Sequence, residues 1–223
     1  MAVSNKTVKA IIFDVGGVLA DNLNWYDGWK EWLKSPNLFE NVQKARHNAW
    51  MQIKVDGSFS LERFWTEVMK AGEIEDHEWK ELNACLESQF RPFFWTLAVA
   101  DRLKQRGYTI GICSNHSDAW FNLIVDRFRF RDVFTEPDLV IASYAVKAAK
   151  PSHAIFDVVM ERLKKKHPEI RRNEVVFIDD QTKNTSSAEK YGWQTIQYNA
   201  GIHSQYDLIE ALQSKSVDAK EHN

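Results

Sequence analysis

Five short apolar runs, each ending at turn or polar residues, constrain the fold of this chain more than any other feature of its sequence. Helical patterns separate the later runs, and one of these patterns, over 94–106, stops at Gly107. The apolar runs cover residues 8–13, 108–113, 139–142, 175–178 and 194–198. Strands that alternate with helices form a parallel sheet covered on both faces. We therefore predict an α/β fold built on a doubly wound parallel sheet.

One long segment breaks this alternation. Residues 22–91 contain helical patterns and little strand signal, with Ser60 placed to cap one of the helices. We predict that 22–91 form an α-helical cap inserted into an α/β core made of 1–21 and 92–214. The polar residues 215–223 are expected to form a disordered tail.

The inserted segment is also rich in tryptophan. The chain has nine Trp and thirteen Phe, and Trp25, Trp29 and Trp32 have the spacing of one helix face. Aromatic side chains are efficient core material for a small helical unit, so most tryptophans of the inserted segment are expected in the interior of the cap. Asn22 and Trp25 lead from the first strand into the insertion, and we expect them to contact the substrate.

Charge and composition exclude several classes of protein. Lys and Arg number 29 and Asp and Glu 31, a net charge of −2, which argues against a nucleic-acid partner held by counterion release. No apolar run reaches the roughly 18 residues of a membrane span, and the polar start has no signal-peptide core. Cys85 and Cys113 make neither a disulfide scaffold nor a four-ligand zinc site. We expect a cytoplasmic monomer or homodimer with no nucleic-acid or membrane partner.

The residues that follow the apolar runs carry the chemistry, because ligands of open α/β sheets bind beyond the carboxyl ends of the strands. Three carboxylates at one sheet edge need a neutralising charge, and Mg²⁺ suits a site with few carboxylates and several waters. A lysine and a hydroxyl beside such a metal can hold a phosphoryl group, and a carboxylate aimed at phosphorus can act as nucleophile. The residues at these ends are Asp14, Ser114, Asn115, the segment 147–150, Asp179 and Asp180.

Four short segments are informative when they are considered together, in their order along the chain and their position after the predicted strands. They are Asp14 to Leu19, Ser114 after 110–113, Lys150-Pro151 with Phe156 behind it, and 177–180 with Asn184 and Gly192 downstream. These segments resemble the four motifs of the haloacid dehalogenase-like (HAD) superfamily. The insertion lies where capped members carry a helical cap. The resemblance implies a Rossmann-like core with an inserted helical cap and a hydrolase activity.

The resemblance also implies a role for each matched residue. It implies a Mg²⁺-dependent phosphatase that acts on a small phosphorylated metabolite through an aspartyl phosphate. Asp14 would be the nucleophile, and Ser114 and Lys150, with Asn115 beside them, would hold the phosphoryl oxygens. The implied Mg²⁺ ligands are Asp14, the backbone carbonyl of Gly16, Asp180 directly and Asp179 through a metal-bound water.

Gly16 is the one departure from the motifs. HAD phosphatases usually carry a second aspartate at this position, which protonates the leaving group and then activates water. Such help is typically worth roughly 10²–10⁴-fold in rate. Three explanations follow: a substrate with a good leaving group such as a sugar 1-phosphate, a substitute acid such as His116 or Asp21, or a non-catalytic binding or regulatory protein.

The 2-haloacid dehalogenases of the same superfamily are a further alternative. They also lack the second aspartate, because a halide leaves without a proton, and they need no metal. The adjacent acids Asp179 and Asp180 favour metal-dependent phosphoryl chemistry, because they would destabilise a metal-free site meant for a carboxylate substrate. Within the third motif Lys147 competes with Lys150, and the following Pro151 favours Lys150 because it suits the start of the next helix.

Overall fold

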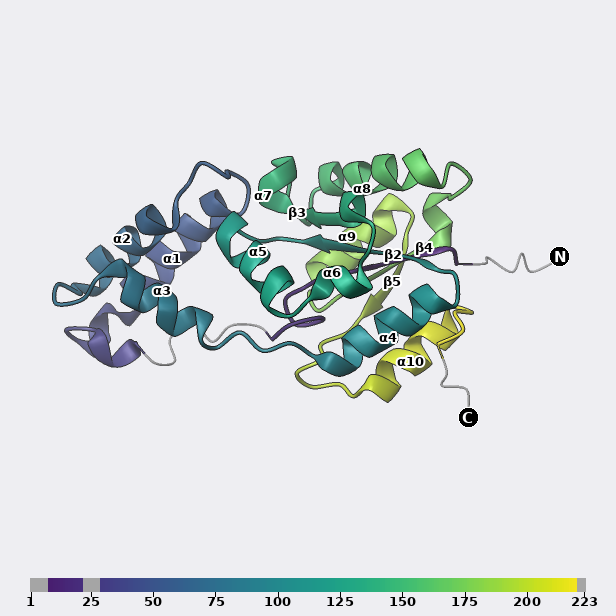
Figure 1. Cartoon of the computed structure of the whole chain (residues 1–223). Helices are drawn as coiled ribbons and strands as arrows, with labels where there is room; N and C mark the ends of the chain where they lie inside the picture. Colours follow the sequence, from purple (N-terminus) through teal and green to yellow (C-terminus); the bar gives the residue numbers. More distant parts are fainter. Residues whose placement is uncertain (1–7, 22–28, 220–223) are drawn as a thin grey trace.

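A five-stranded parallel sheet forms the centre of the computed structural model, which describes residues 8–21 and 29–219. The strand order is β3-β2-β1-β4-β5, with β1 hydrogen-bonded to β2 on one side and to β4 on the other (Figure 1). All five predicted runs are strands, and the α/β fold class is confirmed. The strands are β1 (Ala10–Phe13), β2 (Thr109–Ser114), β3 (Val140–Ala142), β4 (Val175–Asp179) and β5 (Gln194–Gln197).

Helices cover both faces of this sheet because successive side chains of a strand point to opposite faces. Ile11 and Phe13 of β1 belong to one buried cluster, and Ala10 and Ile12 belong to the other. The first cluster includes buried residues of α4 (Phe94–Gln105), α5 (Asp118–Arg127), α6 (Phe130–Val133) and α10 (Gln205–Ser214). The second includes buried residues of α8 (His153–Lys166) and α9 (Thr182–Tyr191). Figure 1 shows α8 on one side of the sheet and α4 and α10 on the other.

Short elements connect these parts. A one-turn helix, α7 (Ser143–Val146), follows β3, and 3₁₀ turns at η3 (Pro137–Leu139) and η4 (Arg172–Glu174) lead into β3 and β4. Within the described residues, no helix has both the length and the apolar character that a membrane crossing requires.

The inserted segment, called the cap below, is helical throughout its described part. Its helices lie beside one end of the sheet, the end toward which β2 points (Figure 1). α1 and α2 pack against each other, and α2 contacts α3. The elements are η1 (Lys30–Trp32), η2 (Pro36–Leu38), α1 (Phe39–Ile53), α2 (Leu61–Gly72) and α3 (Trp79–Glu87). As predicted, Ser60 caps α2, its hydroxyl accepting from the Arg63 backbone N–H at 3.1 Å.

An aromatic cluster joins the cap to the core. The buried indoles of Trp65 in α2 and Trp120 in α5 lie 6.3 Å apart, and Phe64 contacts both rings edge to face. Asn83 in α3 accepts a hydrogen bond from each indole N–H, at 3.1 Å from Trp65 and 2.8 Å from Trp120. Aromatic rings bury large areas, and a shared acceptor satisfies their polar atoms. The core therefore contributes one of its own helices to the interior of the cap.

The two chain segments that enter and leave the cap lie side by side. The Asp21 backbone N–H donates to the Arg91 carbonyl at 2.8 Å, and that of Phe93 donates to the Leu19 carbonyl at 2.9 Å. Ala20 and Pro92 form an antiparallel bridge between these bonds. This short pairing anchors both ends of the insertion beside β1.

Two predictions differ from the structure. The helix expected through Trp25, Trp29 and Trp32 is only a 3₁₀ turn in its described part, because Ser35 is extended before Pro36 and no α-helix continues there. Trp25 itself lies outside the described residues.

The expected disordered tail is wrong for residues 215–219. Val217 and Ala219 are buried against the core, and Asp218 pairs with Arg106 at 2.7 Å. The Ala219 carbonyl also accepts from Arg102 at 3.2 Å. The polar composition of the segment concealed two small apolar residues that pack beside α4. Residues 220–223 lie outside the described part of the chain.

Candidate active site

Asp14 lies directly after β1, at the start of a tight turn that ends at Ala20. Its carboxylate accepts a hydrogen bond from the Val15 backbone N–H at 2.7 Å, and the residue is only 5% exposed. The turn closes where the Gly17 N–H donates to the Ala20 carbonyl at 2.8 Å. Gly17 has a φ of 72°, a left-handed conformation that favours glycine. The local sequence therefore places a buried carboxylate at the carboxyl edge of the central strand.

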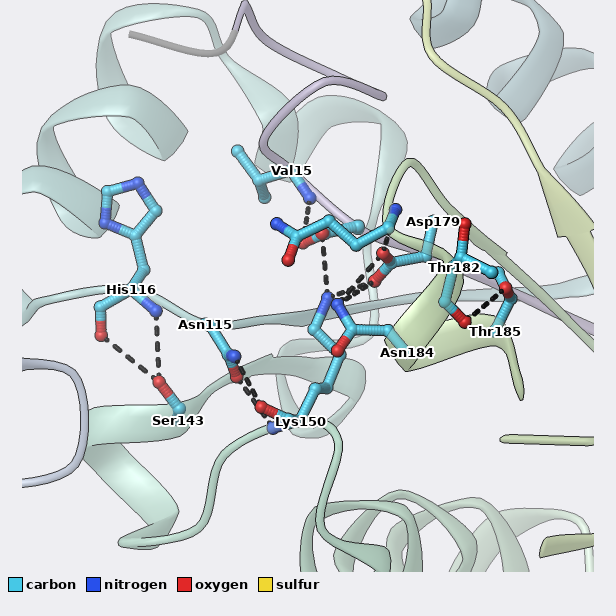
Figure 2. Close-up of polar contacts among 11 residues, drawn as sticks. Val15, Asn115, His116, Ser143, Lys150, Asp179, Thr182, Asn184 and Thr185 are labelled. Atoms are coloured by element: carbon cyan, nitrogen blue, oxygen red, sulfur yellow. Dashed lines mark hydrogen bonds and ion pairs between the residues drawn. The ribbon is translucent and has the colours of Figure 1, made fainter. Parts of the chain in front are cut away.

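Lys150 connects two buried carboxylates. Its Nζ lies 2.8 Å from Asp14 Oδ2 and 2.6 Å from Asp179 Oδ2, and its side chain is completely buried (Figure 2). Asn115 positions this lysine by pairing with its backbone, donating to the Lys150 carbonyl and accepting from the Lys150 N–H, both at 2.8 Å. Lys147 is exposed at the end of α7. Of the two lysines in this motif, Lys150 is the one that the structure brings to Asp14.

Asp179 and Asp180 complete an acidic cluster at the end of β4. Oxygens of Asp14, Asp179 and Asp180 all lie within 4.8 Å of one another. Asp179 is fully buried, and Asn184 donates to its two oxygens at 3.0 and 3.1 Å (Figure 2). The register between β1 and β4 pairs Phe13 with Ile178, so the residues that follow these strands meet at one edge.

Burial and charge pull the pKa values of this cluster in opposite directions. Burial raises the pKa of Asp14 to about 7, although Lys150 beside it acts to lower it. Burial alone would also raise the pKa of Asp179, but Lys150 and hydrogen bonds from Gln181 and Asn184 bring it below its ordinary value. Burial alone would lower the pKa of Lys150, yet the two carboxylates raise it. Two buried carboxylates thus share one lysine, so the charge of Asp14 is incompletely balanced.

The donor set fits a hard divalent cation. The clustered ligand atoms are all carboxylate oxygens, the ligands that Mg²⁺ prefers, and a second positive charge would favour the ionised form of Asp14. Asp179 already accepts hydrogen bonds from Lys150, Gln181 and Asn184 through its two oxygens. The residues that could hold Mg²⁺ are Asp14, Asp180, Asp179 and the backbone carbonyl of Gly16.

A cavity of about 410 Å³ opens above these residues, between the core and the cap. Asp14, Gly16, Asp21, Ser114, Asn115, His116 and Lys150 all line it, so the structure brings these predicted residues together. Asp179 and Asp180 lie beside the cavity and are not part of its lining. The predicted substrate contacts Asn22 and Trp25 lie outside the described residues.

One face of α1 forms the cap side of the cavity, and the sequence interpretation did not include it. The lining residues from this region are Arg46, His47, Trp50, Met51 and Lys54. Arg46, Trp50 and Lys54 are four residues apart, the spacing of one helix face, and this was the available signal. Lys183, in the first turn of α9, adds a further cation on the core side.

Ser114 and His116 follow β2 and play different parts. Ser114 is buried, and its side chain hydrogen-bonds Asp14 and so acts to lower the carboxyl pKa. His116 is held through its backbone N–H, which donates to the Ser143 hydroxyl at 3.0 Å. Its ring packs against Trp50 of the cap, at 6.0 Å between centroids, and lies apart from Lys150 and Asp179 in Figure 2.

The burial of His116 bears on its predicted role as a substitute acid. Burial lowers the pKa of the ring to about 4, so the ring is neutral near pH 7 and has no extra proton to donate. This argues against His116 as the acid that replaces the missing aspartate. Asp21, which is exposed and lines the cavity, is the other group proposed for that role.

Comparison with known proteins agrees with this geometry. The sequence profile of haloacid dehalogenase-like hydrolases matches residues 11–198. The chain belongs to this family. The HAD match begins within β1 and spans the other four strands, the cap and the four motifs. None of the curated proteins matches the chain significantly.

Solved structures of HAD enzymes share the fold. A HAD family enzyme from Bacteroides thetaiotaomicron has a TM-score of 0.70 at 24% identity, covering 91% of this chain and 98% of that one. Its complex with magnesium and inorganic phosphate has a TM-score of 0.64 at 22% identity, covering 89% and 98%. An L-2-haloacid dehalogenase from Xanthobacter autotrophicus with covalently bound chloropropionic acid has a TM-score of 0.60 at 17% identity, covering 97% and 91%. At these identities the likeness shows the HAD fold and does not choose between phosphatase and dehalogenase.

Proposed function

We propose that this HAD hydrolase is a Mg²⁺-dependent phosphohydrolase that acts on a small phosphorylated metabolite through an aspartyl phosphate on Asp14. The observation that carries the proposal is the cluster of three carboxylates whose oxygens lie within 4.8 Å, with Lys150 on two of them. Three acids in so small a space suit a bound divalent cation. The magnesium and phosphate complex of the Bacteroides thetaiotaomicron enzyme supports the same assignment.

The residues of the chain have distinct tasks in this reaction. An Asp14 oxygen attacks phosphorus, a bond forms between them, and the bond from phosphorus to the leaving oxygen breaks. Lys150 and Ser114 hold the transferring phosphoryl oxygens while negative charge develops on them. Water then attacks the phosphorus, releases inorganic phosphate and returns Asp14 to its carboxylate form. Bound Mg²⁺ would supply positive charge to the attacking carboxylate and the phosphoryl group.

Gly16 directs the choice of substrate. It offers no side chain to protonate a leaving oxygen, so we propose that the substrate has a leaving group that needs little help, such as a sugar 1-phosphate. Asp21 is the residue that could still supply a proton from the cavity wall. Activity that falls steeply as the leaving-group pKa rises, and that changes little in Asp21→Asn, would support an unassisted departure.

The dehalogenase alternative fits the observed site less well. Its substrate is an organic carboxylate, and a metal-free cluster of three carboxylates repels such a substrate. The non-catalytic alternative is favoured by one observation, the glycine at position 16. A binding protein would keep the Mg²⁺ site and show no turnover.

Phosphate release from a panel of phosphorylated metabolites, with Mg²⁺ and with chelator, tests the proposal. We expect Mg²⁺-dependent release that Asp14→Asn abolishes, and an unchanged rate in Asp118→Asn, an exposed aspartate at the start of α5. Absence of turnover with every substrate, or equal turnover by Asp14→Asn, would refute it. Halide release from 2-haloacids in the presence of chelator would support the dehalogenase instead.

A further inference from the structure

Two lysines from different parts of the molecule face the same cavity. Lys54 follows the last turn of α1 in the cap, and Lys183 lies in the first turn of α9 in the core. Lys54 is only 9% exposed, whereas Lys183 is exposed at the rim. Neither lysine makes an ion pair with a residue in the described parts of the chain, 8–21 and 29–219.

Contacts of the backbone hold Lys54 in place. The hydroxyl of Ser143, the first residue of α7 directly after β3, donates to the Lys54 carbonyl and accepts from the His116 backbone N–H. Ser143 is fully buried, so this bond connects the end of α1 directly to the carboxyl edge of the sheet. The position of Lys54 over the cavity therefore depends on this hydrogen bond between cap and core.

The two ammonium groups repel each other. Burial lowers the pKa of Lys54, and the nearby charge of Lys183 lowers it further. Two like charges turned to one space, without a carboxylate partner in the described chain, are unfavourable unless an anion comes between them. A fold that keeps them there has a place for such an anion.

Lys54 and Lys183 come from other elements than the residues proposed to hold the transferring phosphoryl group, although all of them line one cavity. Lys150 lies between Asp14 and Asp179, and Ser114 is the last residue of β2. A cavity of about 410 Å³ is in the size range of pockets for whole small ligands, and so has room for more than one phosphoryl group. Outside the Lys150 cluster, the charged side chains of the lining are Arg46, Lys54, Lys183 and Asp21, an excess of positive charge.

We propose that Lys54 and Lys183 bind a second phosphoryl group of the substrate, so that the enzyme acts on bisphosphorylated metabolites and holds the group that it does not transfer between cap and core. The inference rests on the proposed phosphohydrolase function and specifies its substrate class. A phosphate monoester carries nearly two negative charges at neutral pH, which matches two lysines better than a carboxylate does. Binding would also neutralise the repulsion between the cap and core lysines.

A matched series of sugar 1-phosphates tests the proposal. Glucose 1-phosphate, glucose 1,6-bisphosphate and glucuronic acid 1-phosphate share one leaving-group position and carry a hydroxyl, a phosphoryl or a carboxylate group at carbon 6. The quantity measured is kcat/KM for each compound in wild type, Lys54→Met, Lys183→Met and the double variant. Lys190→Met is the matched control, because Lys190 is exposed in the last turn of α9 and does not line the cavity.

We expect the wild type to prefer the bisphosphate over the monophosphate by about 10-fold or more, mainly through KM. Each lysine substitution should lower this preference about 10-fold, since a hydrogen bond to a charged group is worth roughly that factor. Lys190→Met should keep the wild-type preference. An equal or greater preference for the glucuronic acid compound would overturn the assignment of a phosphoryl group.

The failure of the inference is distinguishable from the failure of the proposed function. Turnover of the monophosphate with no bisphosphate preference, or a preference unchanged by both lysine substitutions, refutes the second site and leaves the phosphohydrolase intact. If no compound is hydrolysed, calorimetric titration of glucose 1,6-bisphosphate into the Mg²⁺-loaded protein still decides the binding. Binding that Lys54→Met and Lys183→Met each weaken about 10-fold supports the second site, and binding that they leave unchanged refutes it.

Discussion

The core and the cap contribute to one cavity in different ways. The core places Asp14, Ser114 and Asp179 by the ends of adjacent parallel strands, so their positions follow from the backbone register of the sheet. The cap places Arg46 and Lys54 by the face of one helix that happens to be turned to the core. That orientation depends on side-chain packing between distant segments. The positions of the core residues therefore follow from the topology of the sheet, whereas the positions of the cap residues depend on how the cap packs against the core.

Removing Lys150 should have the largest effect on the core side of the cavity. Lys150→Met leaves Asp14 and Asp179 as neighbouring buried carboxylates, which should lower the free energy of unfolding by about 3–5 kcal/mol without divalent cation. Phosphate release should fall about 10²–10³-fold, since a donor to the transferring group is lost. Urea unfolding with and without Mg²⁺, and phosphate release, measure both.

Lys147→Met is the matched control for that experiment. Lys147 lies three residues earlier in the same motif, and it is exposed. Its substitution should change the free energy of unfolding by less than about 0.5 kcal/mol. If the two variants behaved alike, the assignment of Lys150 to the site would be wrong.

The position of the cap depends on the aromatic cluster of Phe64, Trp65 and Trp120, called the joint below. Trp120 is the member of this cluster that belongs to the core. Trp120→Ala removes a buried ring that packs on Phe64 and Trp65, and should lower the free energy of unfolding by about 3–5 kcal/mol. Because the joint seats the cap, KM should rise more than kcat falls. Trp95→Ala, at a ring that is 38% exposed on α4, should have a much smaller effect on both quantities. Equal effects of the two substitutions would contradict the role given to the joint.

The sequence was sufficient to place those residues whose position follows from the strand directly before them. The residues after each apolar run, Asp14 and Asp179 among them, could be placed at one edge because parallel strands end together. It also chose Lys150 over Lys147, since the proline that follows favoured an extended residue there. These inferences need only a strand, a turn and a short motif.

Residues whose position depends on packing between distant segments could not be placed from the sequence. Which face of α1 turns to the active site is decided by contacts such as the one between Ser143 and the Lys54 carbonyl, which are 89 residues apart. The burial of Val217 likewise depends on the surface beside α4, which the polar composition of the tail does not indicate. Spacing could suggest the helix face of α1, but not what it faces.

The ring of His116 lies between the sheet edge and Trp50, where the core meets the cap. Its pKa is about 4 in the folded protein, below the ordinary value of 6.5. Between these pH values the unfolded chain binds a proton that the folded chain does not, so stability falls as pH falls from 6.5 to 4. Urea unfolding should show that His116→Gln removes about 2–3 kcal/mol of this dependence. A pH dependence identical to that of the wild type would show that the pKa of the ring is the same in the folded and unfolded chains.

The smallest expected effect concerns the end of the chain, far from the cap. Deleting 215–223 exposes the surface beneath Val217 and breaks the ion pair between Arg106 and Asp218. We expect a loss of about 1–2 kcal/mol in the free energy of unfolding and no change in kcat/KM. Deleting only 220–223 is the control. A changed kcat/KM in the 215–223 deletion would contradict the expectation that this segment stabilises the core without affecting the active site.

Trapping a phosphorylated Asp14 during turnover is the decisive experiment for the proposed function, because it shows whether this residue is the nucleophile. The protein is mixed with a turned-over phosphometabolite and Mg²⁺, quenched in acid, digested and analysed by mass spectrometry. We expect a phosphoryl group on the peptide that contains Asp14, present with Mg²⁺, absent with chelator and absent in Asp14→Asn. Turnover at the full wild-type rate by Asp14→Asn, or a phosphoryl group on another residue during turnover, would contradict it.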